Sequence, residues 1–367
     1  MITEKIRVLI TDDSLLFRNV LKNELNSDRN IEVIGTAVDP IDAMEKIKSL
    51  NPDIITLDVE MPKMDGLTFI KKLMIEHPMK VVLVSSMNIN VFDALQSGAV
   101  DFVKKPDMSA DNELQLFFRE LKTKIKIASI AKLVTFKKVK IQEVPIEDVV
   151  KTEEPKQEIK EVKEVKEIKE IKGILKPITR KIIAIGASTG GTEATLKILK
   201  EIPKDFPGIL VTQHMPAGFT KMYADRLNKI CTIEVREAAD GDRIENGLAL
   251  IAPGDMHMRL KKDTKGYYVS CKTGDKVSGH CPSVDVLFSS VAETAGKNSV
   301  GIILTGMGKD GAQGLMNMKK SGAYTIGQDE KSSVVYGMPM VAFNIGAVDI
   351  QASIENIANL LIKQLNK

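Results

Sequence analysis

The feature that most constrains the fold is the stretch 181–191, which reads KIIAIGASTGG. Its first half is a short run of apolar and β-branched residues, which predicts a buried strand of a parallel sheet. The run breaks at the glycine-rich segment 186–190 and continues into a helical pattern at 192–200. Glycines permit a sharp turn from strand into helix. We therefore expect a parallel α/β sheet with Ser188 exposed at the turn.

The turn at 186–190 is a G-x-S-x-G sequence that places Ser188 close to the N-terminus of a helix. Free N–H groups and the helix dipole favour negative charge there, which suits a nucleophilic hydroxyl. Glycine-rich strand-to-helix turns also bind phosphate groups. The turn alone leaves serine chemistry and nucleotide binding open, and residues further along the chain must decide.

Composition narrows the class of protein. A chain of 367 residues predicts two domains, and 43% hydrophobic with 28% charged residues is ordinary for a soluble protein. The net charge of +3, without a basic stripe interleaved with aromatic residues, argues against nucleic-acid binding. We expect no signal peptide and no membrane insertion, because no apolar run is long enough. Three cysteines without zinc-ligand spacing predict buried free thiols and a cytoplasmic location.

Three regions differ in their pattern. Alternating strands and helices predict doubly wound parallel sheets, so the expected fold class is α/β with two such domains, at 1–126 and 179–367. A hairpin-like insertion is expected around 256–271. The predicted strands of the first domain are 7–10, 31–37, 54–57, 81–84 and 101–103, and those of the second are 182–185, 208–212, 249–252, 267–271, 300–304 and 324–327.

The region between the domains, 127–178, contains a triplet repeat of an aliphatic residue, Lys and Glu at 159–171. Each step of three residues turns about 300° in an α-helix, so the apolar stripe would slide around the cylinder. In a strand the apolar residues would fall on both faces. We expect a charged flexible linker, and the alternative is a helix that docks a partner.

Polar side chains follow the predicted strands of the first domain. Asp12 and Asp13 come after the first strand and Asp58 after the third. Parallel strands end at one edge of the sheet, so the three carboxylates should converge and repel one another unless a cation such as Mg²⁺ joins them. Ser85 ends the fourth strand and Lys105 follows the fifth. Each residue alone could be a cap or a solvated charge, but together they indicate a site.

This set resembles the receiver domain of bacterial response regulators, and the resemblance covers the whole first domain. It implies that Asp58 accepts a phosphoryl group from the phosphohistidine of a histidine kinase. One departure is that the segment 87–97 is shorter than the usual loop and fourth helix. The other implied roles are Mg²⁺ ligation by Asp12, Asp13, Asp58 and the backbone carbonyl of Glu60, phosphoryl contacts of Ser85 and Lys105, and an aromatic switch at Phe102.

The second domain must supply partners for Ser188. His214 ends the second strand of this domain, so it should share a sheet edge with Ser188 and could act as a base. His257 and His280 are less constrained, and we expect a structural or surface role for them, although one could line the cleft. Asp310 lies in a glycine-rich turn at the start of a helix, where it either caps the helix or orients the imidazole.

The order Ser, His, Asp differs from the Ser, acid, His order of α/β-hydrolases, so the G-x-S-x-G match does not indicate that family. Triads are defined by geometry, and this order is acceptable. Metal ligands do not cluster in the sequence of this domain. A hydrolysis without metal or other cofactor is therefore the simplest chemistry to expect.

Five segments together resemble the chemotaxis protein-glutamate methylesterases, a family in which a receiver precedes the catalytic domain; they are 186–191, 212–216, 252–255, 282–287 and 304–308. The resemblance spans nearly the whole chain except the linker, whose composition departs from the family. It implies a flavodoxin-like receiver and a Rossmann-like methylesterase domain. It also implies hydrolysis of glutamyl methyl esters on chemoreceptor helices and deamidation of certain receptor glutamines.

Carried over by position, Ser188 is the nucleophile, His214 the base and Asp310 its orienting acid, while Thr189 and Met307 shape the oxyanion hole. The implied partners are chemoreceptors as substrate and the chemotaxis histidine kinase as phosphodonor, and a monomer is expected. The unphosphorylated receiver is expected to cover the catalytic edge. Two alternatives remain: a binding module whose second domain is inactive, and an esterase for small metabolites.

Overall fold

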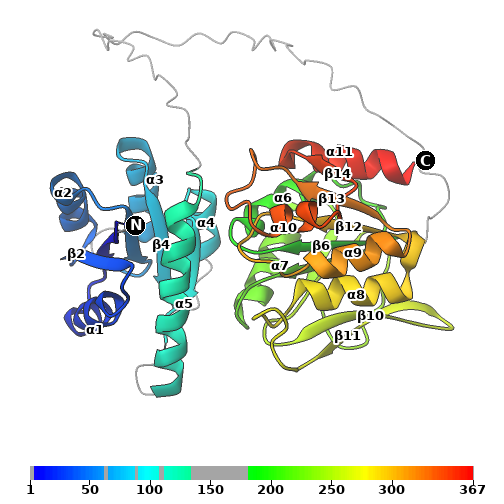
Figure 1. Cartoon of the computed structure of the whole chain (residues 1–367), viewed down its shortest axis with the longest axis horizontal. Helices are drawn as coiled ribbons and strands as arrows, with labels where there is room; N and C mark the ends of the chain where they lie inside the picture. Colours follow the sequence, from blue (N-terminus) through cyan, green and yellow to red (C-terminus); the bar gives the residue numbers. More distant parts are fainter. Residues whose placement is uncertain (1–3, 62–64, 87–89, 107–110, 134–180, 367) are drawn as a thin grey trace, which may run out of the picture.

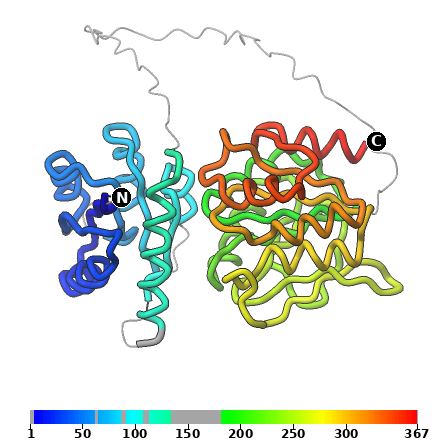
Figure 2. The backbone as a smooth tube through the Cα atoms, viewed as in Figure 1, coloured from blue at the N-terminus to red at the C-terminus, as the bar shows by residue number. Residues whose placement is uncertain are grey.

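The structure is a computed structural model that describes residues 4–61, 65–86, 90–106, 111–133 and 181–366. These residues form two domains that lie side by side, the N-terminal one coloured blue to cyan and the C-terminal one green to red (Figures 1 and 2). The predicted Lys-Glu repeat lies outside the described residues. Among the helices that the structure describes, none combines the length and apolar character that a membrane crossing requires.

The N-terminal domain is a five-stranded parallel sheet in the order β2-β1-β3-β4-β5, with helices packed on both faces. Parallel strands buried on both faces require continuous apolar runs, which is why all five strands were predicted from the sequence. The strands are β1 Ile6–Thr11, β2 Ile31–Ala37, β3 Ile54–Asp58, β4 Lys80–Ser85 and β5 Asp101–Lys104. The helices are α1 Leu15–Asn26, α2 Pro40–Leu50, α3 Gly66–Glu76, α4 Asn90–Gln96 and α5 Asp111–Ile130.

The C-terminal domain is a seven-stranded parallel sheet in the order β14-β13-β12-β6-β7-β9-β8, with the expected antiparallel hairpin β10–β11 beside it. Both domains thus have the predicted doubly wound architecture. The strands are β6 Ile182–Ala187, β7 Ile209–Gln213, β8 Glu234–Glu237, β9 Leu248–Ile251, β10 His257–Asp263, β11 Gly266–Lys272, β12 Ser299–Ile303, β13 Tyr324–Gln328 and β14 Ile350–Ala352. The helices are α6 Gly191–Lys200, α7 Phe219–Ile230, α8 Val284–Thr294, α9 Ala312–Lys320, α10 Met338–Asn344 and α11 Ile354–Leu365, with a short 3₁₀ turn η1 Gly296–Asn298.

Three details differ from the sequence-based expectation. The edge strands β8 and β14 were missed because they are short and only partly buried, so they carry no continuous apolar run. The predicted end of the first domain at residue 126 falls inside α5, because Ala128 still packs into the core of the N-terminal domain. All three cysteines are free, but only Cys271 is buried, whereas Cys231 and Cys281 are half-buried.

The two domains meet through the face of the N-terminal domain formed by α4, β5 and α5. Aromatic rings cross the contact, since Phe102 lies 4.7 Å from Phe219 and Phe92 lies 5.5 Å from Tyr223, measured between ring centroids. The buried Arg226 of α7 donates to Gln96 Oε1 at 2.9 Å and pairs with a carboxylate from each domain, Asp93 at 3.6 Å and Glu193 at 3.2 Å. An apolar centre flanked by polar contacts therefore joins the domains.

Candidate functional site

The three predicted catalytic residues follow three neighbouring strands in the middle of the larger sheet. Ser188 follows β6, His214 follows β7 and Asp310 lies in the turn after β12. β6 is the point from which later strands are added on either side, and such a switch point is where ligands bind in open α/β sheets. The backbone ties two of these turns together, since His214 N–H donates to Ala187 O at 3.1 Å.

The turn at Ser188 depends on glycines. Gly190 is the N-cap of α6 with φ of 77°, a conformation that other residues rarely adopt. Gly306, in the loop after β12, passes so close that an added Cβ would lie 2.6 Å from the Cβ of Ser188. With both domains in place Ser188 is only 8% exposed, so the expectation of an exposed serine is wrong. The sequence pattern places the turn but does not reveal the loop that covers it.

His214 and Asp310 form a direct pair in which Nε2 lies 2.8 Å from Oδ2. The side chains are 6% and 1% exposed, respectively. Nδ1 of His214 is buried, and it has no hydrogen-bond partner among the described residues. In the tautomer that donates Nε2–H to Asp310, Nδ1 keeps its lone pair and can accept a proton. This orphaned atom is what a general base requires.

Asp310 is held by the N-terminus of α8. Its Oδ1 accepts from Ser283 Oγ at 2.8 Å and from Asp285 N–H at 3.0 Å, and its Oδ2 accepts from Val284 N–H at 2.8 Å. Burial raises the pKa of Asp310, but the hydrogen bonds from His214 and these backbone groups outweigh it and lower the pKa to about 2. Asp310 thus caps α8, rather than the helix α9 that follows it.

Thr189 lies within the serine turn, and Met307 lies in the loop after β12, next to Gly306, which passes close to Ser188. The hydroxyl of Thr305 donates to Thr189 O at 3.0 Å, and Gly306 N–H donates to Val335 O at 3.0 Å, so both loops are fixed. Within the part of the chain that the structure describes, the backbone N–H groups of Thr189 and Met307 donate no hydrogen bond. Two free donors beside a serine are suited to receiving a developing oxyanion.

The two remaining histidines of this domain differ. His257 is structural, because its Nε2 lies 2.8 Å from Asp275 O and its Nδ1 accepts from Ser283 N–H at 3.3 Å. His280 instead stacks on His214, with ring centroids 3.6 Å apart and planes 9° from parallel. The sequence analysis expected a structural or surface role for His280, and the stack on His214 instead fits the alternative that one of these histidines lines the cleft.

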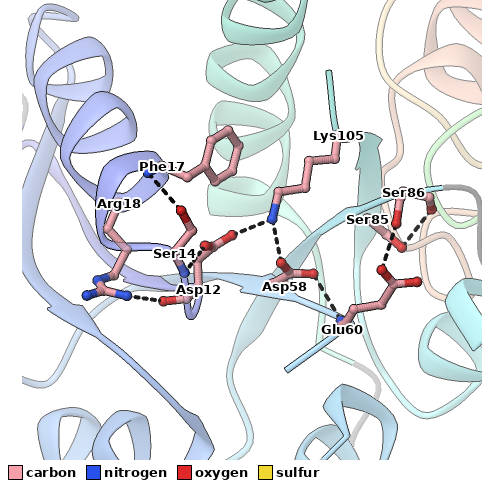
Figure 3. A network of polar contacts seen from close by, with 9 residues as sticks. All are labelled: Asp12, Ser14, Phe17, Arg18, Asp58, Glu60, Ser85, Ser86 and Lys105. Carbon is pink, nitrogen blue, oxygen red and sulfur yellow. Dashed lines mark hydrogen bonds and ion pairs between the residues drawn. The ribbon is translucent and has the colours of Figure 1, made fainter. Parts of the chain in front are cut away.

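The acidic cluster of the N-terminal domain is also assembled. Carboxylate oxygens of Asp12, Asp13 and Asp58 lie within 4.8 Å of one another, which suits a hard divalent cation. Figure 3 shows Lys105 Nζ between two of them, 2.9 Å from Asp12 Oδ2 and 2.6 Å from Asp58 Oδ2. Burial raises the pKa of Asp58 to about 6; Lys105 opposes this shift, while the Asp12 carboxylate adds to it.

The other residues predicted for this site lie around Asp58. Glu60 N–H donates to Asp58 Oδ1 at 3.0 Å, and the carboxylate of Glu60 accepts from Ser86 Oγ at 2.9 Å (Figure 3). The buried hydroxyl of Ser85 donates to the carbonyl of Ser86 at 2.9 Å. The ring of Phe102 lies in the contact between the domains, against Phe219.

One polar contact connects the two sites. The hydroxyl of Thr189 donates to the carboxylate of Asp101, the first residue of β5. The same carboxylate pairs with Lys124 Nζ of α5 at 2.8 Å. The residue that follows Ser188 is therefore bonded to the strand that carries Phe102.

Comparison with known proteins gives the same division of the chain. Residues 8–115 match the response regulator receiver domain, and residues 183–361 match the CheB methylesterase family. A protein-glutamate methylesterase/protein-glutamine glutaminase 2 of Syntrophomonas wolfei is 48% identical over 99% of this chain and 98% of its own length. The corresponding protein of Sulfurimonas denitrificans is 47% identical over 96% of each chain.

A solved structure agrees with the larger domain. The CheB methylesterase catalytic domain of Thermotoga maritima is 38% identical, with a TM-score of 0.50, and the match covers 51% of this chain and 100% of that one. Receiver and catalytic parts are both present here, in the order of the full-length relatives. This chain belongs to the protein-glutamate methylesterase/protein-glutamine glutaminase family.

Proposed function

We propose that this chain removes methyl esters from glutamate side chains of chemoreceptors and deamidates certain receptor glutamines. Ser188 is the nucleophile, His214 the general base and Asp310 the acid that orients it. The observation that carries the proposal is the His214 ring, whose Nε2 is tied to Asp310 while its buried Nδ1 has no partner among the described residues. These three side chains can carry the ester hydrolysis without a cofactor.

The reaction follows from these groups. Nδ1 of His214 takes the proton of Ser188 as Oγ attacks the ester carbonyl, and the backbone N–H groups of Thr189 and Met307 receive the oxyanion. His214 returns the proton to the departing methoxide, so methanol leaves and a glutamyl ester of Ser188 remains. Water then attacks this ester, with His214 again taking a proton, and glutamate is released. With a glutamine substrate, ammonia leaves in place of methanol.

The N-terminal domain acts as a phosphorylation switch. Asp58 attacks the phosphohistidine of a chemotaxis histidine kinase and becomes an aspartyl phosphate. Asp12, Asp13, Asp58 and the backbone carbonyl of Glu60 would hold Mg²⁺, which when bound offsets the charge of the phosphoryl oxygens. Lys105 and the hydroxyl of Ser85 contact those oxygens, and Lys105 gives up its present bonds to Asp12 and Asp58 in doing so.

The unphosphorylated receiver inhibits the esterase by covering it. The contact between Asp101 and Thr189 occupies a residue of the oxyanion hole, which supports this arrangement. Phosphorylation draws Ser85 and Lys105 toward Asp58 and rearranges β5, including Phe102. The equilibrium between closed and open arrangements then shifts toward the open one. The chain acts as a cytoplasmic monomer.

The test is methanol release from membranes that contain methylated receptors, with and without a small-molecule phosphodonor. We expect release by the full chain, stimulation by the phosphodonor, and little hydrolysis of small free esters. Fast hydrolysis of small esters with no release from receptor membranes would instead support a metabolite esterase. No release from any ester would support the inactive binding module.

The inhibitory contact has its own test. Asp101→Asn weakens the acceptor for Thr189 while it keeps the shape of the side chain, and it also removes the charge that pairs with Lys124. We expect higher activity without phosphodonor and a smaller stimulation by it. A matched control is Asp53→Asn, at an acid that precedes β3 and accepts from Arg7 N–H of its own domain, which should change neither value. Unchanged basal activity of Asp101→Asn would argue that this contact does not inhibit.

A further inference from the structure

We infer that His280 is a positioning residue, which fixes the orientation of the His214 imidazole by stacking against its face. The inference rests on the proposed function, because it concerns the base of that reaction. Its basis is the parallel stack of the two rings at 3.6 Å, a contact that the triad itself does not require. His280 touches the base and not the reacting atoms, so it is not a catalytic residue.

The need for such a contact follows from the geometry of His214. Its ring is held at one edge by Asp310 Oδ2, while Nδ1 has no partner among the described residues. The torsion that turns an imidazole about its bond to Cβ is broad, so a single hydrogen bond restrains it weakly. A flat ring 3.6 Å away closes one side of that motion. A base must point at the proton that it takes, so this restraint bears on the rate.

The chain holds His280 rigidly. Val277 and His280 exchange two backbone hydrogen bonds of 3.0 Å, and the intervening Ser278 and Gly279 have φ of 53° and 87°. Positive φ at both central residues is typical of the tight turns that close two-residue hairpins. The ring of His280 is thus presented on a closed loop rather than on a free segment.

The same segment holds both partners of His214. His280 covers the face of the imidazole, and three to five residues later the chain donates to Asp310 from Ser283, Val284 and Asp285. A shift of this segment would therefore move the stacked ring and the orienting carboxylate together. The segment 280–285 works as one support for the base.

The charge state of His280 is compatible with this role. Burial lowers the pKa of His280 to about 4, helped by the adjacent His214 and by Lys124 and Lys276, with Asp310 opposing. His280 is therefore neutral around neutral pH, when His214 must gain a proton during catalysis. A neutral ring adds no repulsion to the imidazolium that forms, whereas a second cation at 3.6 Å would.

The test compares three variants of the full chain, activated by phosphodonor, in methanol release from methylated receptor membranes. His280→Ala removes the ring, His280→Leu keeps bulk without a flat face, and His280→Phe keeps a flat neutral ring. We expect Ala and Leu to lower kcat by roughly ten-fold or more with little change in KM, since small misplacements of catalytic groups have large effects. His280→Phe should restore kcat to within about three-fold of the unaltered chain.

Val277→Ala is the matched control, because it alters the same turn without removing the stacked ring, and it should leave kcat unchanged. The pH dependence should keep its shape in His280→Phe, since His280 does not titrate in the working range. Thermal unfolding of each variant distinguishes a misplaced His214 ring from an unfolded protein. If His280→Ala does not fold, the comparison of His280→Leu with His280→Phe still tests the inference.

Two outcomes would overturn the inference: a kcat of His280→Leu equal to that of the control, or a kcat of His280→Phe as low as that of Leu, which would mean that a ring nitrogen is required. Either result is distinct from failure of the proposed function, which would appear as absence of methanol release by the unaltered chain or as full activity of Ser188→Ala.

Discussion

Asp58 and Asp310 are both buried at the carboxyl edge of a parallel sheet, yet their surroundings shift their pKa values in opposite directions. Asp310 receives donors from His214 and from the N-terminus of α8, and its pKa is lowered to about 2. Asp58 shares its site with other carboxylates and one ammonium, and burial raises its pKa to about 6. Equal burial thus gives opposite results, and the number of donors decides between them. Asp310 already has donors to both of its oxygens, whereas Asp58 is the residue that we propose receives a cation and a phosphoryl group.

The largest effect should come from Ser188→Ala, which removes the proposed nucleophile but leaves Asp310 and the His214 imidazole in place. Methanol release from receptor membranes should fall by about 10⁵-fold or more, as in other serine hydrolases. The near-UV circular dichroism and the thermal midpoint should stay close to those of the unaltered chain. Activity above a few per cent would show that another residue attacks the ester.

The second-largest effect should come from a substitution of Asp310. Asp310→Asn keeps its shape but cannot fix the tautomer of His214 that leaves Nδ1 free, so kcat should fall by roughly 10³- to 10⁴-fold. Steady-state kinetics of the variant and of the unaltered chain on methylated receptor membranes measure the change. A kcat for Asp310→Asn within ten-fold of normal would argue against this acid as the orienting group.

A smaller effect is expected from Asp58→Asn, which removes the proposed acceptor of the phosphoryl group in the N-terminal domain. Stimulation by phosphodonor should disappear, while basal methanol release stays within about two-fold of normal because the catalytic groups are untouched. Chelation of divalent cations in the unaltered chain should abolish stimulation in the same way. If stimulation persists in Asp58→Asn, another residue must carry the phosphoryl group.

The smallest effect concerns stability. A carboxyl group whose pKa is raised on folding stabilises the folded chain below its unfolded pKa, near 3.8, and that contribution is lost as pH rises through about 6. In chelator at pH 7.5, Asp58→Asn should therefore be more stable than the unaltered chain, on the order of 1 kcal/mol. The difference should vanish near pH 4 and shrink when Mg²⁺ is added. Denaturant unfolding at the two pH values measures it.

Much of this arrangement could be predicted from the sequence because both sites are built at strand ends. A buried parallel strand is a continuous apolar run, and the residue after it lies at a known edge of the sheet. That logic brought Asp12 and Asp58 together, and likewise Ser188, His214 and Asp310, without knowledge of any helix packing.

What escaped prediction depends on contacts between distant segments. The loop at Gly306 passes close to Ser188, the capping of α8 by Asp310 joins two turns, and the stack of His280 on His214 joins two loops. No local pattern encodes such contacts. The last turn of α5, residues 127–130, was assigned to the linker, because its short sequence IASI does not reveal that Ala128 packs into the core.

The packing of Phe102 between the two domains has a thermodynamic consequence. Its ring contacts Phe92 of its own domain and Phe219 of the other, so the side chain proposed as the aromatic switch is also part of the interface between the domains. Linkage then works in both directions. By whatever factor occupancy of the Asp58 site favours opening, opening favours occupancy of that site. A non-covalent phosphoryl analogue should therefore bind more tightly when a receptor already holds the domains apart, and the substrate would prime its own enzyme for activation.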